Sequence, residues 1–248
     1  MYTGTKPVDE LSAVAPVMAS LDAAPLTLET VEIINIVYEA SADANEAVLP
    51  AGLHPTMPPI VTWTVWRCPD GPLGPFAMAQ TRIECRSGMR PRGFLVSAIV
   101  DSPVAALALS AGWGYACRPG SVEVDRAYDR TVLRVSDADG ATLLDVDVVD
   151  PVTLRPGDIQ WIASMHLAHT PRGLRLIQVD PDIEVVRAER ARPSVRSFDA
   201  ARWGEPRLRP VHPVAAALAR ATVTLPRLRY LCAPDQLAFF STEVLDLP

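Results

Sequence analysis

Residues 31–38 read Val31-Glu32-Ile33-Ile34-Asn35-Ile36-Val37-Tyr38, a run dominated by β-branched side chains. Such residues are enriched in strands, so this run predicts a β-strand. Residues 60–67 predict a second one, because their side chains alternate between two faces. One face carries Val61, Trp63 and Val65, and the other carries Thr62, Thr64 and Trp66. The second strand therefore has large side chains on both faces.

Many more short strands are expected along the chain. They fall at residues 76–85, 94–100, 121–124, 131–135, 142–149, 158–167, 174–179 and 183–191. Short helices are expected at residues 8–21, 40–49, 103–110 and 214–221. Regularly spaced short strands with few helices predict an antiparallel barrel or sandwich, that is, a mainly β (α+β) fold. We expect residues 1–28 to form a tail with one short helix, and residues 29–248 to form a single domain.

The chain of 248 residues has 23 basic residues, of which Lys6 is the only lysine. Its formal net charge of −6 argues against a nucleic-acid partner, because phosphate binders normally carry a basic patch. Imine catalysis needs an amine that loses its proton, which an arginine does not do in proteins. Unless Lys6 does this work, the protein does not act through an imine.

Four cysteines stand at positions 68, 85, 117 and 232, without a CxxC pair or a zinc-like spacing. The first residues include Asp9 and Glu10 and do not resemble a signal peptide. No apolar run is long enough to span a membrane. We therefore expect a cytoplasmic protein with reduced thiols, no membrane partner, and no metal or other cofactor.

Two pairs of titratable residues are possible sites that we interpret as structural. His166 and His169 would share one side of a helix, but in the strand expected here they face opposite sides. Asp145 and Asp147 share a strand face, which is either a paired acid site or a solvated face, and we favour the solvated face. None of the usual nucleotide, hydrolase or zinc-protease motifs is present.

The densest run of unusual residues is Gly112-Trp113-Gly114-Tyr115-Ala116-Cys117-Arg118-Pro119-Gly120. Arg118 beside Cys117 would lower the thiol pKa and make Cys117 a nucleophile. The alternative is an inert buried cysteine, which is the commoner case. Earlier in the chain, Trp63, Trp66, Phe76 and Met78 either line a ligand pocket or form plain core.

The order of these parts resembles the acetoacetate decarboxylase family over residues 31–244. The resemblance rests on the strand at 31–38, the Ala-rich helix ending at Pro50, the strand at 60–67 and the turn Pro72-Leu73-Gly74. It continues with Asp101-Ser102-Pro103, Tyr115-Ala116-Cys117-Arg118, the turn at Pro171, Phe198-Asp199 and Leu225-Pro226. The resemblance implies a cone-shaped antiparallel β-barrel with a central cavity.

In that family a lysine forms an imine with a β-keto acid, and a second lysine, two glutamates and an arginine complete the site. The resemblance places the lysine pair on Cys117 and Arg118, or on Gly114 and Tyr115, depending on the register. It places the glutamates near Trp63 and Met78, and the arginine near Val31. With all these groups replaced, it implies a larger, apolar cavity with few polar groups to orient a ligand.

We therefore expect a lysine-independent enzyme of specialised metabolism, acting on an apolar or carbonyl-containing small molecule such as a polyketide derivative. Cyclisation, dehydration or isomerisation, by a lyase or an isomerase/cyclase, would fit better than decarboxylation. The candidate catalytic residues are Tyr115, Arg118, Glu84 and Cys117, and the candidate substrate-binding residues are Trp63, Met78, Gln80, Arg82 and Gly114. One alternative is a binding barrel without catalysis, and another is a thiol enzyme that uses Cys117. We expect a homo-oligomer.

Overall fold

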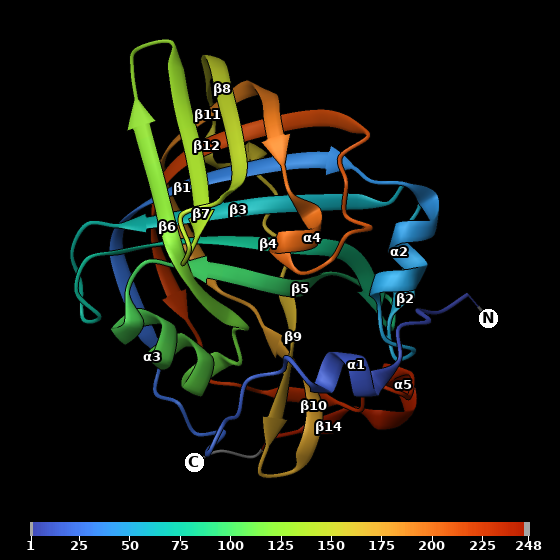
Figure 1. The fold of residues 1–248 in the computed structure, drawn as a ribbon. Helices are drawn as coiled ribbons and strands as arrows, with labels where there is room; N and C mark the ends of the chain where they lie inside the picture. Colours follow the sequence, from blue (N-terminus) through green and yellow to red (C-terminus); the bar gives the residue numbers. More distant parts are fainter. Residues whose placement is uncertain (1, 246–248) are drawn as a thin grey trace.

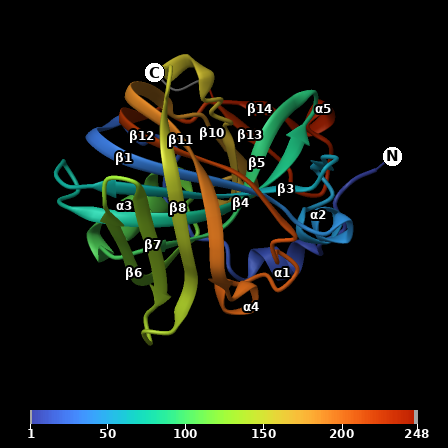
Figure 2. The same ribbon diagram turned by 90° about the horizontal axis from the view of Figure 1, so that it is seen from above.

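A computed structural model describes residues 2–245 and contains a closed ring of nine strands. Each ring strand pairs with its two neighbours in the order β4-β5-β6-β7-β8-β11-β12-β1-β3-β4. The pairs are antiparallel except β5–β6. The ring strands are β1 (Leu26–Glu39), β3 (Ile60–Cys68), β4 (Phe76–Ser87), β5 (Arg90–Val100), β6 (Cys117–Arg126), β7 (Arg130–Asp137), β8 (Thr142–Leu154), β11 (Asp182–Phe198) and β12 (His212–Leu225). Seen from above, β8 and β11 cross over β1, β3 and β4 (Figure 2).

A second group of strands branches from β5, which also pairs with β9. This arm comprises β9 (Ser164–Thr170), β10 (Gly173–Val179), β13 (Tyr230–Cys232) and β14 (Glu243–Val244). It lies below the ring (Figure 1). The two-residue strand β2 (His54–Pro55) pairs with the end of β4.

The helices are short and lie around the strands. They are α1 (Val8–Ser12), α2 (Ala42–Val48), α3 (Pro103–Trp113), α4 (Ala200–Trp203), α5 (Ala238–Ser241) and the single 3-10 turn η1 (Pro156–Asp158). None of the helices within residues 2–245 is long and apolar enough to cross a membrane. The expected mainly β fold with a few short helices is confirmed.

Two buried apolar clusters lie on opposite faces of the ring strands. The inner cluster draws side chains from every ring strand, so it fills the ring; examples are Ile36, Trp63, Ile83, Leu133, Val146 and Leu218. Aromatic rings pack there, with Trp63 4.2 Å from Tyr38 and 4.7 Å from Phe198 between ring centroids. The outer cluster lies against the other face of β1, β3, β4, β5 and β12, where α3 and the arm cover it.

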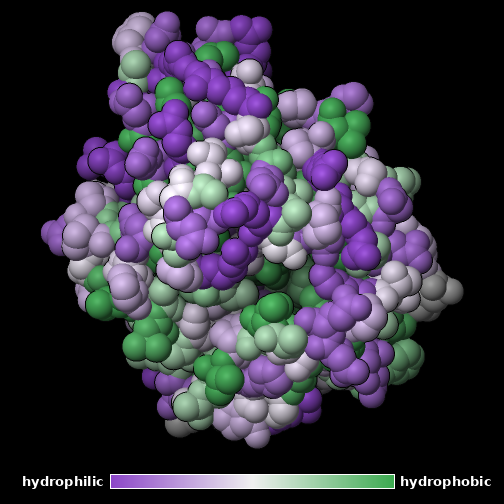
Figure 3. Space-filling model, in the orientation of Figure 1, coloured by the Kyte–Doolittle hydropathy of each residue, from purple (hydrophilic) through white to green (hydrophobic). Residues whose placement is uncertain are grey.

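The surface reflects this arrangement. The outer ends of β6, β7 and β8 are mostly hydrophilic, whereas apolar side chains gather over α3 (Figure 3). Val104 and Leu107 of α3 are among the exposed large apolar residues. The segment before β1 is packed down, because Leu11 and Met18 are buried and Val17 forms a bridge to His169.

Three sequence expectations were wrong. Residues 214–221 lie in β12 rather than in a helix, because pairing with both β1 and β11 outweighs the helix preference of alanine. Residues 158–163 are not strand, since the turn at Pro156 interrupts pairing and β9 begins only at Ser164. The first helix ends at Ser12 instead of residue 21, and Pro16 prevents its continuation.

Candidate active site

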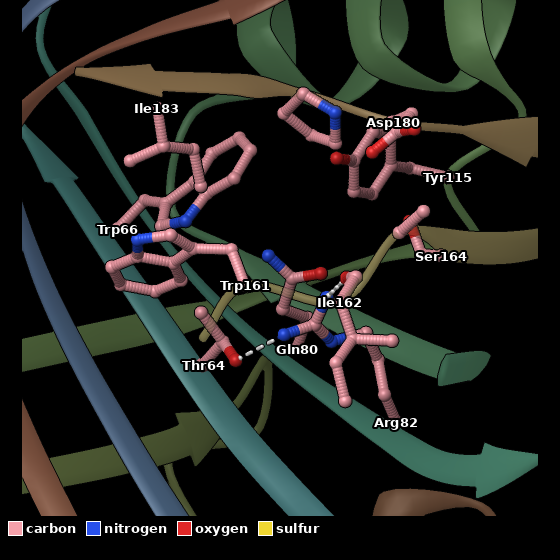
Figure 4. Close-up of a pocket in the computed structure, with 12 residues that line it drawn as sticks. Thr64, Trp66, Gln80, Arg82, Tyr115, Trp161, Ile162, Ser164, Asp180 and Ile183 are labelled. Atoms are coloured by element: carbon pink, nitrogen blue, oxygen red, sulfur yellow. Dashed lines mark hydrogen bonds between the residues drawn. The ribbon is translucent and has the colours of Figure 1, made fainter. Parts of the chain in front are cut away.

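A small enclosed cavity of about 50 Å³ lies against the outer face of β3 and β4. The segment before β9 and the turn between β10 and β11 close it from the other side. Thr64 and Trp66 of β3, Gln80 and Arg82 of β4, and Tyr115 after α3 point into it (Figure 4). A bound water occupies roughly 10–15 Å³ by this measure, so the cavity takes only about three or four water-sized groups.

Strand alternation places these side chains together. Thr64 pairs directly with Gln80 across β3 and β4, and Arg82 follows two residues later on the same face. Trp63, between Thr62 and Thr64, points to the opposite face and into the inner cluster. The site is thus built on the outer face, while the ring interior is filled with apolar side chains.

Arg82 is held in place at the floor of the cavity. Its Nη2 donates to Thr64 Oγ1 at 2.8 Å, and its Nη1 donates to the carbonyl oxygen of Ile162 at 3.3 Å. Gly93 leaves room for this side chain, since a Cβ there would lie 3.4 Å from Cβ and Cδ of Arg82. Burial lowers the pKa of Arg82, while the nearby Tyr115 and Glu84 oppose this effect. Arginine remains cationic in proteins, so the cavity contains a fixed positive charge.

Several hydrogen-bond donors on the residues that line the cavity have no acceptor. Trp66 Nε1, Trp161 Nε1 and Arg82 Nε are buried and have no partner among the described residues. All three groups are donors only. The amide of Gln80, on a residue only 2% exposed, likewise forms no hydrogen bond within residues 2–245. The cavity therefore matches a ligand that presents acceptor oxygens.

Tyr115 reaches the cavity because of the way α3 begins and ends. Ser102 caps the first turn by accepting a hydrogen bond from Ala105 N at 3.3 Å. The helix terminates at Gly114, whose φ of 68° lies in the left-handed region. Ser110 Oγ then donates to the carbonyl oxygen of Tyr115 at 2.8 Å. Burial raises the pKa of the Tyr115 phenol, so the hydroxyl stays protonated and acts as a donor.

The ring of Tyr115 packs against the imidazole of His166. The imidazole is fully buried, and its Nδ1 lies 2.7 Å from the carbonyl oxygen of Trp113. Burial lowers the pKa of His166 to about 3, so the ring is neutral at physiological pH. His166 and His169 both lie in β9 on opposite faces, as the sequence predicts. No group of three metal-ligating residues occurs among residues 2–245.

The structure brings together three of the nine site residues predicted from the sequence. Gln80, Arg82 and Tyr115 line the cavity, and Gly114 lies directly beside it. Met78 shares the outer face but is packed into the apolar cluster. Glu84 follows Arg82 on the same face; burial raises its carboxyl pKa, although the charge of Arg82 opposes this.

The other predicted residues lie elsewhere. Trp63 is in the inner cluster, and Arg118 donates to the carbonyl oxygens of Arg202 and Trp203 at 2.9 and 2.8 Å. Arg118 does not lower the thiol pKa of Cys117, in agreement with the alternative of an inert buried cysteine. Burial raises that pKa to about 11, and the guanidinium donates to backbone carbonyl oxygens of α4 instead.

The lining of the cavity combines apolar and polar groups. Ile162, Ala163, Pro181 and Ile183 are apolar, as expected, whereas Thr64, Gln80 and Arg82 add polar groups from β3 and β4. At about 50 Å³ the cavity is too small to enclose the larger ligand that was expected. Sequence reasoning missed Trp161 and Asp180 as lining residues. Both lie in irregular segments, which carry no periodic pattern. Trp161 falls within the strand wrongly expected at residues 158–167, and Asp180 directly follows the strand expected at residues 174–179.

Lys6, the single lysine, lies outside this cavity. Its Nζ is 2.5 Å from Glu205 Oε2, and the Glu205 side chain is only 2% exposed. The backbone of the neighbouring residues bonds to the α2 region, as in Thr5 N to the carbonyl oxygen of Glu46 at 2.8 Å. No lysine therefore faces the described cavity.

The family model of acetoacetate decarboxylase (ADC) matches residues 14–231. The chain belongs to the acetoacetate decarboxylase family. No curated protein matches it in sequence. The likeness among solved structures is one of fold, because the identities are all low.

A structure of acetoacetate decarboxylase has a TM-score of 0.74 and 20% identity, covering 90% of this chain and 89% of that one. A structure of acetoacetate decarboxylase from Legionella pneumophila has a TM-score of 0.72 and 18% identity, covering 85% and 88%. The enduracididine biosynthesis enzyme MppR, with HEPES buffer bound, has a TM-score of 0.71 and 18% identity, covering 87% and 90%. The expected acetoacetate-decarboxylase-like fold is confirmed.

The residues near which the resemblance places the family's charged groups are apolar and lie in the two buried clusters. Val31 and Met78, where the resemblance places the arginine and one glutamate, both lie in the outer cluster with Tyr115. Trp63, where it places the other glutamate, lies across the strand in the inner cluster. The donor-lined cavity begins beside this apolar region, at Trp66 and Tyr115.

Proposed function

We propose that this ADC-family member is a lysine-independent enzyme that binds a carbonyl-containing small molecule and catalyses an enolisation-based step. The observation that carries the proposal is the cavity in which Arg82, Trp66 and Trp161 present donor groups without acceptors. Cyclisation, dehydration and isomerisation all begin with such a step. A similar structure is named as a biosynthesis enzyme, MppR, which supports a role in specialised metabolism.

Binding would use the donors at the cavity floor. A carbonyl oxygen accepts from Arg82 Nε and from an indole N–H, and the fixed cation stabilises the negative charge that develops when the α-carbon loses a proton. Because Arg82 is already oriented by Thr64 and the Ile162 carbonyl, its guanidinium reorganises little during the reaction. The small cavity admits only the reacting end of the molecule.

Proton transfer would use two groups that line the cavity. Asp180, at the turn after β10, takes the proton from the α-carbon, and the protonated Tyr115 hydroxyl donates to the enolate oxygen or to a leaving hydroxide. Glu84 would act through Arg82, since the two charges influence each other. Decarboxylation is not favoured, because a fixed cation stabilises the carboxylate relative to neutral carbon dioxide.

The alternative is a ligand-binding protein without catalysis. One observation favours it: neither His166, with a pKa of about 3, nor Tyr115, with a raised pKa, exchanges a proton near neutral pH. The two functions then differ in whether Asp180 takes a proton from the bound molecule and Tyr115 gives one to it.

Pyruvate in heavy water tests the proposal, because it carries a ketone and is small. A structure of MppR holds pyruvate. We expect the purified protein to exchange the methyl protons for deuterium, as followed by proton NMR. Asp180→Asn should reduce the exchange rate at least about a hundredfold and Tyr115→Phe at least about tenfold. Asp129→Asn, an exposed carboxylate outside the cavity, is the matched control.

Two results would decide against the proposal. Saturable pyruvate binding without exchange would favour the binding protein. A borohydride-trapped pyruvate adduct on Lys6, detected by mass spectrometry, would overturn lysine independence.

A further inference from the structure

A groove of about 430 Å³ runs between the β4–β5 turn, the edge of the arm and α5. Its lining joins two arginines, Arg90 and Arg92, to Gln178 and the aromatic residues Tyr230 and Phe239. None of these residues belongs to the cavity described above. The groove therefore needs its own explanation.

Arg92 is the unusual member of this groove. The residue is only 7% exposed, and its Nη1 donates to the carbonyl oxygen of the preceding Pro91 at 2.8 Å. Its Nε is buried without a partner, and no ion pair forms with any residue in the described range 2–245. A buried charge without a counterion is costly, and natural proteins normally pair it.

Two charged neighbours also act on Arg92. Burial lowers the pKa of Arg92, the charge of Asp180 opposes this effect, and the charge of Arg90, which lines the same groove, adds to it. Two guanidinium groups face one space in a protein whose net charge is −6. An anion between them would relieve both the repulsion and the desolvation.

One wall of the groove carries large apolar side chains. Phe239 and Met89 are 67% and 84% exposed, which is high for residues of this size. The Phe239 ring covers the turn at Gly88, where an added Cβ would lie 3.5 Å from its Cζ. An apolar wall beside two cations matches a molecule with an anionic head and a hydrocarbon body.

The groove and the cavity both border a second groove, of about 580 Å³. This second groove shares Arg90, Gln178 and Tyr230 with the first groove, and it shares Asp180 with the cavity. A molecule whose carbonyl end entered the cavity would leave its remaining atoms along this path.

We propose that Arg90 and Arg92 bind the anionic group, a carboxylate or a phosphate monoester, of an amphipathic small molecule whose apolar part lies on Phe239 and Met89. Both anions have two oxygens that can accept hydrogen bonds from two N–H groups of one guanidinium. That this molecule is the substrate rests on the proposed function; the anion site itself does not.

Isothermal titration calorimetry with the whole protein tests the site. The probes are octanoate, octyl phosphate, octanol and inorganic phosphate, each below its micelle concentration. We expect octanoate or octyl phosphate to bind, and the stronger of the two identifies the anion. Octanol and inorganic phosphate should bind at least about tenfold more weakly, because each lacks one half of the recognised molecule.

Arg92→Met removes the charge and keeps the length of the side chain. It should weaken binding at least about tenfold, whereas Arg92→Lys should retain part of the affinity. Arg209→Gln, an exposed arginine outside the groove, is the control and should bind as the wild type does.

Thermal unfolding separates a binding role from a structural one. If Arg92 is held for a ligand, Arg92→Met unfolds at the same temperature as the free wild type or higher, because an unpaired buried charge is gone. A lower unfolding temperature with unchanged octanoate affinity would overturn the proposal, as would equal binding of octanol. Since no turnover is measured, this site and the pyruvate exchange can each fail without the other.

Discussion

The ring of Tyr115 stands edge-on to the imidazole of His166, with ring centroids 4.3 Å apart and 64° between the planes. The Trp113 carbonyl can only accept, so the nearby Nδ1 of His166 carries the proton. Nε2 then bears a lone pair that has no partner within residues 2–245. The end of α3 and the cavity wall are therefore fixed by a neutral histidine.

This histidine predicts acid sensitivity. Its pKa falls from 6.5 to about 3 on folding, so the unfolded chain binds the proton first as the pH drops. The stability due to the neutral ring is complete above pH 6.5 and is lost as the pH falls toward 3. We expect the free energy of unfolding to decrease by about 1.4 kcal/mol per pH unit in this window. Urea unfolding of the wild type and His166→Gln measures it, and equal pH slopes would contradict the assignment.

Gly114 and Gly140 form a matched pair for testing the close packing behind Tyr115. Both have positive φ, 68° and 80°, but a Cβ on Gly114 would lie 3.1 Å from Ile177 Cδ1, whereas Gly140 has nothing within 4 Å. Gly140→Ala should cost only the backbone strain, about 1–2 kcal/mol. Gly114→Ala should cost about 1–3 kcal/mol more from overpacking. Denaturant unfolding compares them, and equal losses would mean that the site is loosely packed.

Trp63 and Trp66 occupy opposite faces of β3. Substituting Trp63 should therefore lower the free energy of unfolding, whereas substituting Trp66 should weaken ligand binding. Trp63→Ala empties part of the inner cluster and should cost about 3–5 kcal/mol of unfolding free energy. Trp66→Phe keeps most of the packing and removes one donor from the cavity, so pyruvate affinity should fall about fivefold. Calorimetry on the folded variants checks this; weaker pyruvate binding by Trp63→Ala and unchanged binding by Trp66→Phe would reverse the assignment.

Cys117 should be unreactive at neutral pH. Burial raises its thiol pKa to about 11, so little thiolate exists near pH 7. Iodoacetamide labelling, followed by mass spectrometry, should be at least about tenfold slower than for free cysteine at pH 7 and should accelerate as the pH rises. Cys117→Ser should retain pyruvate exchange. Fast labelling at neutral pH, with exchange abolished in this variant, would restore the thiol mechanism.

Much of the fold could be predicted because strand patterns are local. The alternation in residues 60–67 and the strands expected at residues 131–135 and 142–149 correspond to β3, β7 and β8. The Ala-rich β12 could not be recognised, because its conformation depends on partners on both sides that lie far away in sequence. Ring closure through the parallel β5–β6 pair is equally non-local.

The site was harder to predict than the fold. Gln80 and Arg82 are two residues apart in an expected strand, which places them on one face, and they share a face in β4. The alternation of side chains along a strand does not tell which of its two faces is covered by the rest of the protein. Trp63 and Trp66 could therefore not be distinguished as pocket residues from the sequence. Asp180 and Trp161 come from connecting segments, whose positions are set by the packing of the arm against the ring.

The branching of the sheet at β5 also determines where its pairing order stops. Among the described residues, the two terminal strands are β2 and β14, each only two residues long. Pro55 in β2 lacks an N–H group, and Glu243 in β14 is held by Arg172 and Arg175. Neither of these two terminal strands offers another chain a long row of unpaired backbone groups, so edge-to-edge pairing through them is disfavoured.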